Sequence, residues 1–148
     1  SGTVSAALEA AIEKIPAIAV SVEEEATIED YKYAAQFIKN LLLNKNHLKF
    51  FSENVLNVNI PRISLGPIVG IEVTSQGLKR YGNTIDKRVD PRGKEYYWLS
   101  GKLLDIDPSK NTDLAAIAKR AISLTPLSFD LTNYELINVL NSWKNSLT

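Results

Sequence analysis

The sequence predicts an α/β protein that carries a β-rich appendage. In the first 77 residues, amphipathic helical patterns alternate with short apolar runs, as in folds that cover a sheet with helices. Residues 79–104 instead hold two β-prone arms around a turn, and the chain then returns to helix and strand patterns. The 148 residues are enough for about one domain with a buried core.

The first predicted helix covers residues 3–14, where apolar side chains recur at helical spacing. Pro16 ends this pattern, because proline lacks the amide that a helix interior needs. The run AIAVSV at 17–22 is apolar without clean alternation. Such a run is typical of a strand that is covered on both faces, as in a parallel sheet.

A second helix is predicted from Ile28 to about residue 43. Thr27 and Asp30 form a capping-box pattern, in which a carboxylate satisfies free amides of the first turn. Acidic residues gather at 23–25 and 29–30, but a hard cation needs oxygen ligands that converge from separate elements. These residues therefore indicate a solvated loop and a helix start.

The strand predicted at 54–61 alternates in polarity. Three aliphatic side chains face one way, and Asn57 and Asn59 face the other. Asparagine is depleted in strands, so two interpretations are open. Either these amides line a polar cleft, or they satisfy the backbone of neighbouring loops, which is the favoured interpretation. A further strand is predicted at 67–77.

Residues 79–104 predict a long β-hairpin with its turn at 90–93, where the sequence reads DPRG. Tyr96 and Trp98 share one face of this hairpin. An isolated hairpin is marginally stable in water, so a packing partner is expected for its aromatic rings.

Residues 79–95 of this hairpin carry six basic side chains against three acidic ones. Basic groups interleaved with aromatic rings are typical of a surface that binds single-stranded nucleic acid. They are also ordinary on an exposed arm, where charge keeps a strand edge from aggregating. The second interpretation is favoured. Under the first one, Arg88 and Arg92 are the candidate contacts.

The rest of the chain predicts a helix, a strand and a final helix. A cap at 111–113 begins a short helix through Arg120, and the run AISLTPL predicts a strand at 121–127. Thr132 and Glu135 form a second capping-box pattern before the final helix. The apolar stripe of that helix consists of Leu136, Leu140, Trp143 and Leu147.

The composition excludes several classes of site. The formal net charge is zero, so charge alone does not imply binding to nucleic acid or to a membrane. The chain has no cysteine, and its single histidine, His47, cannot build a multi-histidine metal site and is expected in a surface loop. No run approaches the roughly 20 apolar residues of a membrane span, and charges within the first 22 residues argue against a secretory signal. A cytoplasmic location is expected.

Ser1, Gly2 and Thr3 open the first helix. A helix start offers free backbone N–H groups and the positive end of the helix dipole, and hydroxyl groups add further donors. Glycine lets a ligand come close to the backbone. These residues are therefore suited to hold a phosphate. They are also common in a plain helix cap, and spacing alone favours that interpretation.

Six stretches, taken in order, resemble the C-terminal part of the SurE family of 5'/3'-nucleotidases, the stationary-phase survival proteins. They are SGTVSAALEAAIEKIPAIAVS at 1–21, LNVNIP at 56–61, VTSQGLKRY at 73–81, DPRGKEYYWLSG at 90–101, NTDLAAI at 111–117 and ISLTPLSFDLT at 122–132. Together they are spread over residues 1–132 of the chain, and their shared order makes the resemblance specific. Asn111 departs from the family pattern, which usually has glycine before Thr-Asp.

The resemblance implies a Rossmann-like α/β core with a projecting β-hairpin arm and a C-terminal helix. It implies one domain, with core residues 1–77, the arm at 78–104, and a short helix, a return strand and the last helix within 105–148. In the family, the arm and the last helix serve oligomer assembly by exchange between subunits. A homo-oligomer, either a dimer or a tetramer, is therefore expected through 78–104 and 132–148.

The resemblance also implies a phosphomonoesterase that acts on nucleoside monophosphates and uses one divalent cation per subunit, Mg²⁺ or Mn²⁺. The family's metal ligands are two adjacent aspartates, a serine and an asparagine, and all are expected upstream of Ser1. No metal ligand and no catalytic residue is assigned within this chain, so it is predicted to be inactive alone. The family's phosphate-side turn is similar to Ser1, Gly2 and Thr3. With this resemblance, a phosphate-binding role for these residues is favoured over a plain helix cap.

Two alternatives remain open. In the first, the chain is a non-catalytic oligomerisation module. In the second, it binds nucleic acid through the hairpin arm. No membrane partner is expected, and no nucleic acid beyond short oligonucleotides.

Overall fold

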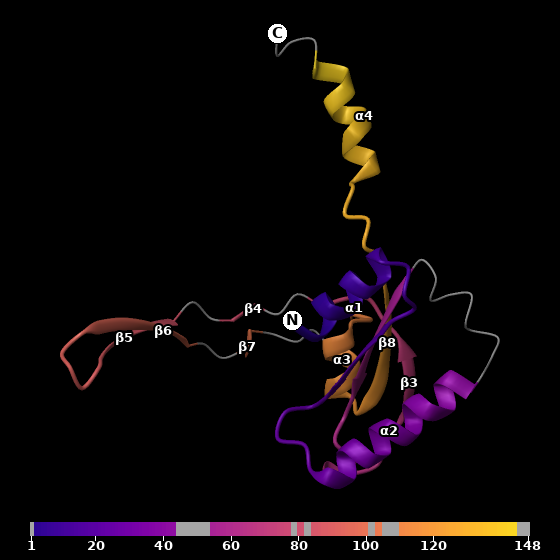
Figure 1. The fold of residues 1–148 in the computed structure, drawn as a ribbon, viewed down its shortest axis with the longest axis vertical. Coiled ribbons are helices and arrows are strands. Elements are labelled where there is room, and N and C mark those ends of the chain that lie inside the picture. Colours follow the sequence, from indigo (N-terminus) through magenta and orange to yellow (C-terminus); the bar gives the residue numbers. More distant parts are fainter. Residues whose placement is uncertain are drawn as a thin grey trace.

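The computed structural model describes residues 2–43, 54–77, 80–81, 84–100, 103–104 and 110–144. A four-stranded sheet with helices on both faces forms the body, a hairpin arm extends sideways from it, and a C-terminal helix stands apart (Figure 1). The predicted α/β class, with a projecting hairpin arm and a terminal helix, is confirmed. His47 lies outside the described residues.

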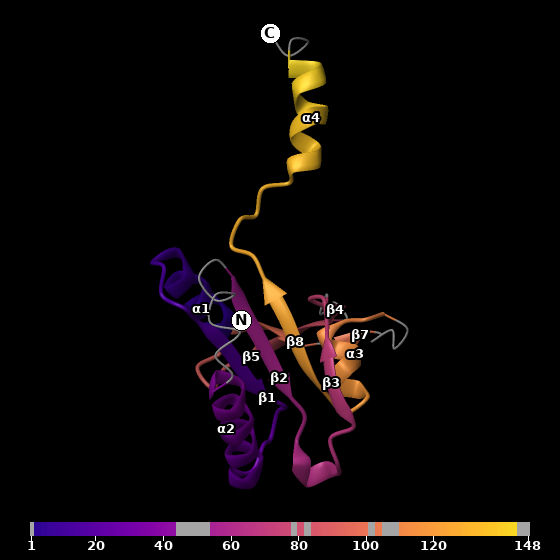
Figure 2. The ribbon, with the colours of Figure 1, turned by 90° about the vertical axis from the view of Figure 1, so that its right-hand side faces the viewer.

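The main sheet has the strand order β1–β2–β8–β3. Its strands are β1 (Ile18–Val22), β2 (Val55–Ile60), β3 (Gly70–Val73) and β8 (Ala121–Leu127). β1 runs parallel to β2, while β8 is antiparallel to β2 and parallel to β3. A strand from late in the sequence therefore lies in the middle of the sheet (Figure 2).

Helices cover both faces of this sheet. The covering helices are α1 (Gly2–Ile12), α2 (Ile28–Leu43) and α3 (Asp113–Ala118). The chain also forms a 3-10 turn, η2 (Ile63–Leu65), and a helix that stands apart from the sheet, α4 (Tyr134–Trp143). α2 covers one face, and α1 and α3 lie on the face from which the hairpin leaves (Figure 1). Among the described residues, no helix is long and apolar enough to cross a membrane.

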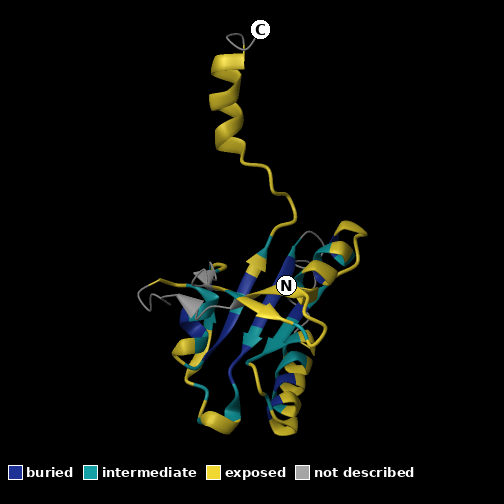
Figure 3. Cartoon of the chain, turned by 90° about the vertical axis from the view of Figure 1, so that its left-hand side faces the viewer, coloured by how far each residue is buried: buried dark blue, intermediate teal, exposed yellow. Residues whose placement is uncertain are grey.

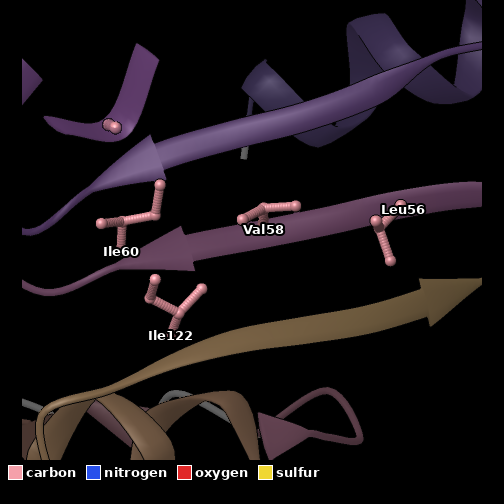
Figure 4. Packing of buried hydrophobic residues seen from close by; sticks show 5 residues of the cluster. Leu56, Val58, Ile60 and Ile122 are labelled. Atoms are coloured by element: carbon pink, nitrogen blue, oxygen red, sulfur yellow. The ribbon is translucent and has the colours of Figure 1, made fainter. Parts of the chain in front are cut away.

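The main apolar core lies between α2 and the sheet. Leu56, Val58 and Ile60 of β2 pack with Ile122 of β8 and with Ala34 of α2 (Figure 4). Fully burying an aliphatic side chain contributes about 1.5–3 kcal/mol, so this cluster supplies much of the driving force that closes α2 onto the sheet. The alternation predicted at 54–61 is confirmed, since its aliphatic side chains share this face.

The capping box predicted for α2 is confirmed. Asp30 Oδ2 accepts hydrogen bonds from the Thr27 amide at 2.8 Å and the Thr27 hydroxyl at 2.7 Å. The same carboxylate accepts from the Ser64 amide at 2.9 Å and from the Ser64 hydroxyl at 3.0 Å. Asp30 therefore joins the start of α2 to the η2 turn.

Three predicted element ends were wrong. The strand predicted at 67–77 is regular only over β3, followed by an isolated bridge between Ser75 and Thr112. The helix predicted through Arg120 ends at Ala118, because Arg120 has a φ of 64° and leaves the helical conformation. The final helix is capped by Asn133 rather than by Thr132, since the Asn133 side chain accepts from the Leu136 amide at 3.1 Å.

The hairpin arm has its turn where the sequence predicts it. β5 (Thr84–Val89) pairs antiparallel with β6 (Glu95–Ser100), and β4 (Arg80–Tyr81) pairs with β7 (Leu103–Leu104). The Gly93 amide donates to the Asp90 carbonyl at 2.9 Å, and Gly93 has a φ of 82°, which favours glycine there.

Candidate phosphate-binding site

The first turn of α1 presents its backbone amides to open space. Gly2 and Thr3 are exposed there, while Ser1 lies outside the described residues. The first amides of a helix have no partner within the helix, and those of Gly2, Thr3 and Val4 donate to no other described segment. A Cβ atom built on Gly2 would meet no atom within 4 Å, so an anion has room to approach.

The packing of α1 fixes where this first turn lies. Ala7 and Ala11 pack against Ala19 of β1 and Val55 of β2, and a short connection joins the end of α1 to the start of β1. α1 must therefore run against the direction of β1 and β2, so its first turn points toward their C-terminal ends. Figure 3 looks onto this face and shows the start of α1 in front of the central strands.

Polar side chains line the sheet on this face, in the two rows that follow Val55 along β2. In one row, Asn57 of β2 lies between Ala19 and Thr125. In the next row, Asn59 lies between Ser21 and Ser123. Because side chains alternate along a strand, both asparagines face the side that α1 covers.

Three hydroxyl groups on β8 and after β3 form a closed cluster. Thr74 Oγ1 lies 2.8 Å from Ser123 Oγ and 2.7 Å from Thr125 Oγ1, and the latter two are 3.3 Å apart. All three residues are buried. The sequence analysis missed this cluster, although Ser123 and Thr125 are spaced to share one face of the predicted strand.

Asn57 is buried without a hydrogen bond. The residue is 7% exposed, and its side chain makes no hydrogen bond to any described residue. Arg62 Nε is the single fully enclosed side-chain nitrogen or oxygen without a partner in the described parts of the chain, so the Asn57 amide is not sealed in. The interpretation that this amide satisfies neighbouring loops is not supported.

The described residues do not form a metal centre. No group of three or more histidine, cysteine, aspartate or glutamate side chains within the described ranges is placed to hold a cation. Among the acidic side chains at 23–25 and 29–30, Asp30 caps α2, and Glu29 pairs with Lys32 at 2.7 Å. Glu23 and Glu25 contact Arg62.

Among the described residues, two carboxyl groups have lowered pKa values, and neither lies at the first turn of α1. Burial raises the pKa of Asp30, but hydrogen bonds from the backbone and hydroxyls of Ser64 and Thr27 outweigh it and hold the pKa well below its usual range. A hydrogen bond from the Thr132 side chain, followed by one from the Tyr134 hydroxyl, lowers the pKa of Asp130 to about 2.

Two basic side chains of the hairpin arm, Lys87 and Arg88, contact partners on the arm itself. Lys87 Nζ lies 2.6 Å from Glu95 Oε1, and Arg88 lies 3.7 Å from Asp86 and 5.7 Å from the centre of the Trp98 ring. These contacts favour the interpretation of an ordinary charged arm over that of a nucleic-acid surface.

Asn111, which replaces the family's usual glycine, adds a contact. Its Nδ2 donates to the Val73 carbonyl at 2.9 Å, and its own carbonyl accepts from the Ser75 amide at 3.0 Å. Its φ is not in the positive region, so the backbone does not require glycine here.

Comparisons with known proteins find similar sequences along most of this chain. The sequence profile described as Survival protein SurE matches residues 1–83. The protein named 5'-nucleotidase SurE from Thermoanaerobacter sp. (strain X514) is 50% identical over 97% of this chain. The protein of the same name from Carboxydothermus hydrogenoformans is 44% identical over 99% of it. The chain spans 56% of the length of each relative.

A solved structure also has this fold. The crystal structure of the SurE protein from Aquifex aeolicus has a TM-score of 0.72 and 35% sequence identity, and the match covers 97% of this chain and 58% of that one. The profile, the relatives and the fold lead to one conclusion: this chain belongs to the SurE family.

Proposed function

We propose that this chain supplies the phosphate-binding side of a nucleotidase that hydrolyses nucleoside 5'- or 3'-monophosphates. Its family, the name 5'-nucleotidase SurE that its relatives carry, and the exposed first turn of α1 support this proposal. Because the chain spans 56% of those relatives, we propose the activity for a SurE protein that contains it. The expected cytoplasmic location stays a prediction.

The open amides at the start of α1 are the observation on which this proposal rests. The N–H groups of Gly2, Thr3 and Val4 offer donors to phosphoryl oxygens, and the dipole of the 11-residue helix favours negative charge at the same place. Donors that are already oriented stabilise the charge that develops on these oxygens as the ester bond breaks. The Thr3 hydroxyl adds a further donor, and the resemblance adds Ser1.

One divalent cation per subunit, Mg²⁺ or Mn²⁺, is part of the proposal. When bound, such a cation polarises phosphate oxygens and lowers the pKa of a coordinated water. The described residues do not fit a cation. The resemblance assigns its ligands to residues upstream of Ser1.

A substitution at Thr3 tests this function in a full-length SurE protein that carries this chain. Thr3→Val removes a hydroxyl donor without changing the side-chain shape, and we expect the turnover of a nucleoside monophosphate to fall about tenfold or more. Thr3→Ser keeps the hydroxyl and should retain most of the rate. If both variants turn over at the rate of the parent protein, the Thr3 hydroxyl has no role in the reaction.

The 148 residues alone, given Mg²⁺ or Mn²⁺, should show no turnover. Robust turnover would contradict the assignment of the metal ligands to residues upstream of Ser1.

We also propose that the chain assembles with copies of itself, as a dimer or a tetramer, through residues 78–104 and 132–148. Large apolar side chains are exposed on both segments, including Trp98 on the arm and Leu140 on α4. Exposed apolar surface of this kind is typical of a contact with a partner subunit.

A further inference from the structure

We propose that Asn57 is a binding residue of the phosphate site, whose side-chain amide donates a hydrogen bond to an oxygen of the bound phosphate. The proposal rests on the proposed function, because it requires an anion at the first turn of α1. It adds a side chain from the sheet to a site so far built from helix amides and hydroxyls.

The first step is the position of Asn57. Val4, in the first turn of α1, packs on the cluster that contains Ala19 and Val55. Asn57 is the strand partner of Ala19 and stands two residues after Val55 on β2. It therefore occupies the next place on this face, toward the C-terminal end of β2, which is the direction in which the first turn of α1 points.

The second step is its unsatisfied polarity. Asn57 is 7% exposed and has no hydrogen-bond partner among the described residues. Because this amide is not sealed in, a ligand that enters the site can supply the missing acceptor. The neighbouring hydroxyls of Ser123 and Thr125 do not fill this role, because they bond to Thr74 and to each other.

The third step is the charge of the ligand. The start of α1 carries the positive end of the helix dipole and has no acidic residue in its first turn. The rows of Asn57 and Asn59 hold hydroxyls, amides and one carboxylate, Glu72, which lies on β3, two strands away from β2. The amide of Asn57 is a donor near the start of a helix, and the only carboxylate in these rows lies two strands away. This combination fits an oxyanion such as a phosphate group.

A titration of a full-length ¹⁵N-labelled SurE protein that carries this chain tests this inference by NMR. The titrant is inorganic phosphate, at constant ionic strength set with chloride. We expect the backbone amides of Gly2, Thr3 and Val4 and the side-chain NH₂ of Asn57 to shift with one saturation curve. In Asn57→Ala the dissociation constant should rise about tenfold, as for loss of one hydrogen bond to a charged group. Asn40→Ala, which changes an exposed amide on α2, should bind as the parent chain does.

The outcomes separate this inference from the proposed function. If the α1 amides shift but the Asn57 NH₂ does not, or if Asn57→Ala binds phosphate unchanged, the role of Asn57 is overturned and the helix site stands. If the α1 amides do not respond to phosphate, both proposals fail. Should Asn57→Ala not fold, the Asn57 NH₂ resonance of the parent chain still decides the matter.

Discussion

At the scale of single residues, the buried carboxylate of Asp30 connects the start of α2 to the η2 turn. The residue is 1% exposed, and its carboxylate accepts hydrogen bonds from both the amide and the hydroxyl of Thr27 and of Ser64. These donors stabilise the charged carboxylate more than burial destabilises it, so the pKa of Asp30 lies below its usual value. A carboxyl group whose pKa is depressed on folding makes stability depend on pH.

Asp30→Asn is therefore expected to lower the free energy of unfolding near neutral pH, because an amide cannot accept from all four donors. The folded pKa is depressed, so the contribution of Asp30 is fully present above the unfolded value of about 3.9 and is lost as pH falls below it. Urea unfolding from about pH 7 to about pH 3 should show the difference between parent and variant shrinking as the pH drops.

Glu29→Gln is the matched control, since Glu29 is exposed and pairs only with Lys32 on the surface. Its effect on unfolding should be small throughout, as is usual for exposed ion pairs. A difference for Asp30→Asn that stays constant down to low pH would show that Asp30 acts by shape and not by charge.

At the scale of elements, α3 is attached to the end of β3 by a close contact that requires glycine. The Gly77 amide donates to Asp113 Oδ1 at 2.8 Å. A Cβ atom at Gly77 would lie 2.7 Å from that oxygen and 2.9 Å from Leu114 Cδ1. The first turn of α3 is held from its other side by Thr112, whose hydroxyl accepts from the Ala115 amide at 3.2 Å.

Gly77→Ala should destabilise the chain by about 1–3 kcal/mol, because the added methyl group overlaps Asp113 and Leu114 and must displace α3. Gly70→Ala on β3 is the control, since a Cβ atom there meets nothing within 4 Å, and it should change stability by less than about 0.5 kcal/mol. Urea unfolding of both variants measures this. Equal stabilities would show that the α3 contact yields without cost.

The same elements show what the sequence could and could not predict. The caps at Thr27 and Thr112 were predictable because each rests on contacts within three residues along the chain. The cap of α4 was placed one residue early, since Thr132 and Asn133 are both good caps and only the backbone geometry selects Asn133.

The candidate site was predictable only in part, because it depends on contacts between distant segments. The motif at residues 1–3 pointed to the start of α1 through resemblance. The burial of Asn57 depends on β8, which follows it by more than 60 residues and lies beside β2. No local pattern fixes that neighbour, so the sequence left the role of the asparagine open.

At the scale of the whole molecule, α4 has no buried residue and does not pack against the sheet. It has 10 residues, and a helix this short is marginal in water unless its apolar side packs against something. Leu136 and Leu140 are each 53% exposed, and the helix stands away from the sheet (Figure 2). A second copy of the chain would cover this surface in the proposed oligomer.

Removing residues 132–148 is therefore expected to shift the protein to a smaller species, measured by light scattering coupled to size exclusion. The double substitution Leu136→Asp, Leu140→Asp should have the same effect with the chain length kept, because charges cannot be buried in an apolar contact without partners. Asn141→Asp adds a charge to the same helix at a polar position and should leave the assembly intact. If all of these proteins keep the mass of the parent, α4 is not an assembly element, and the hairpin arm remains as the proposed contact.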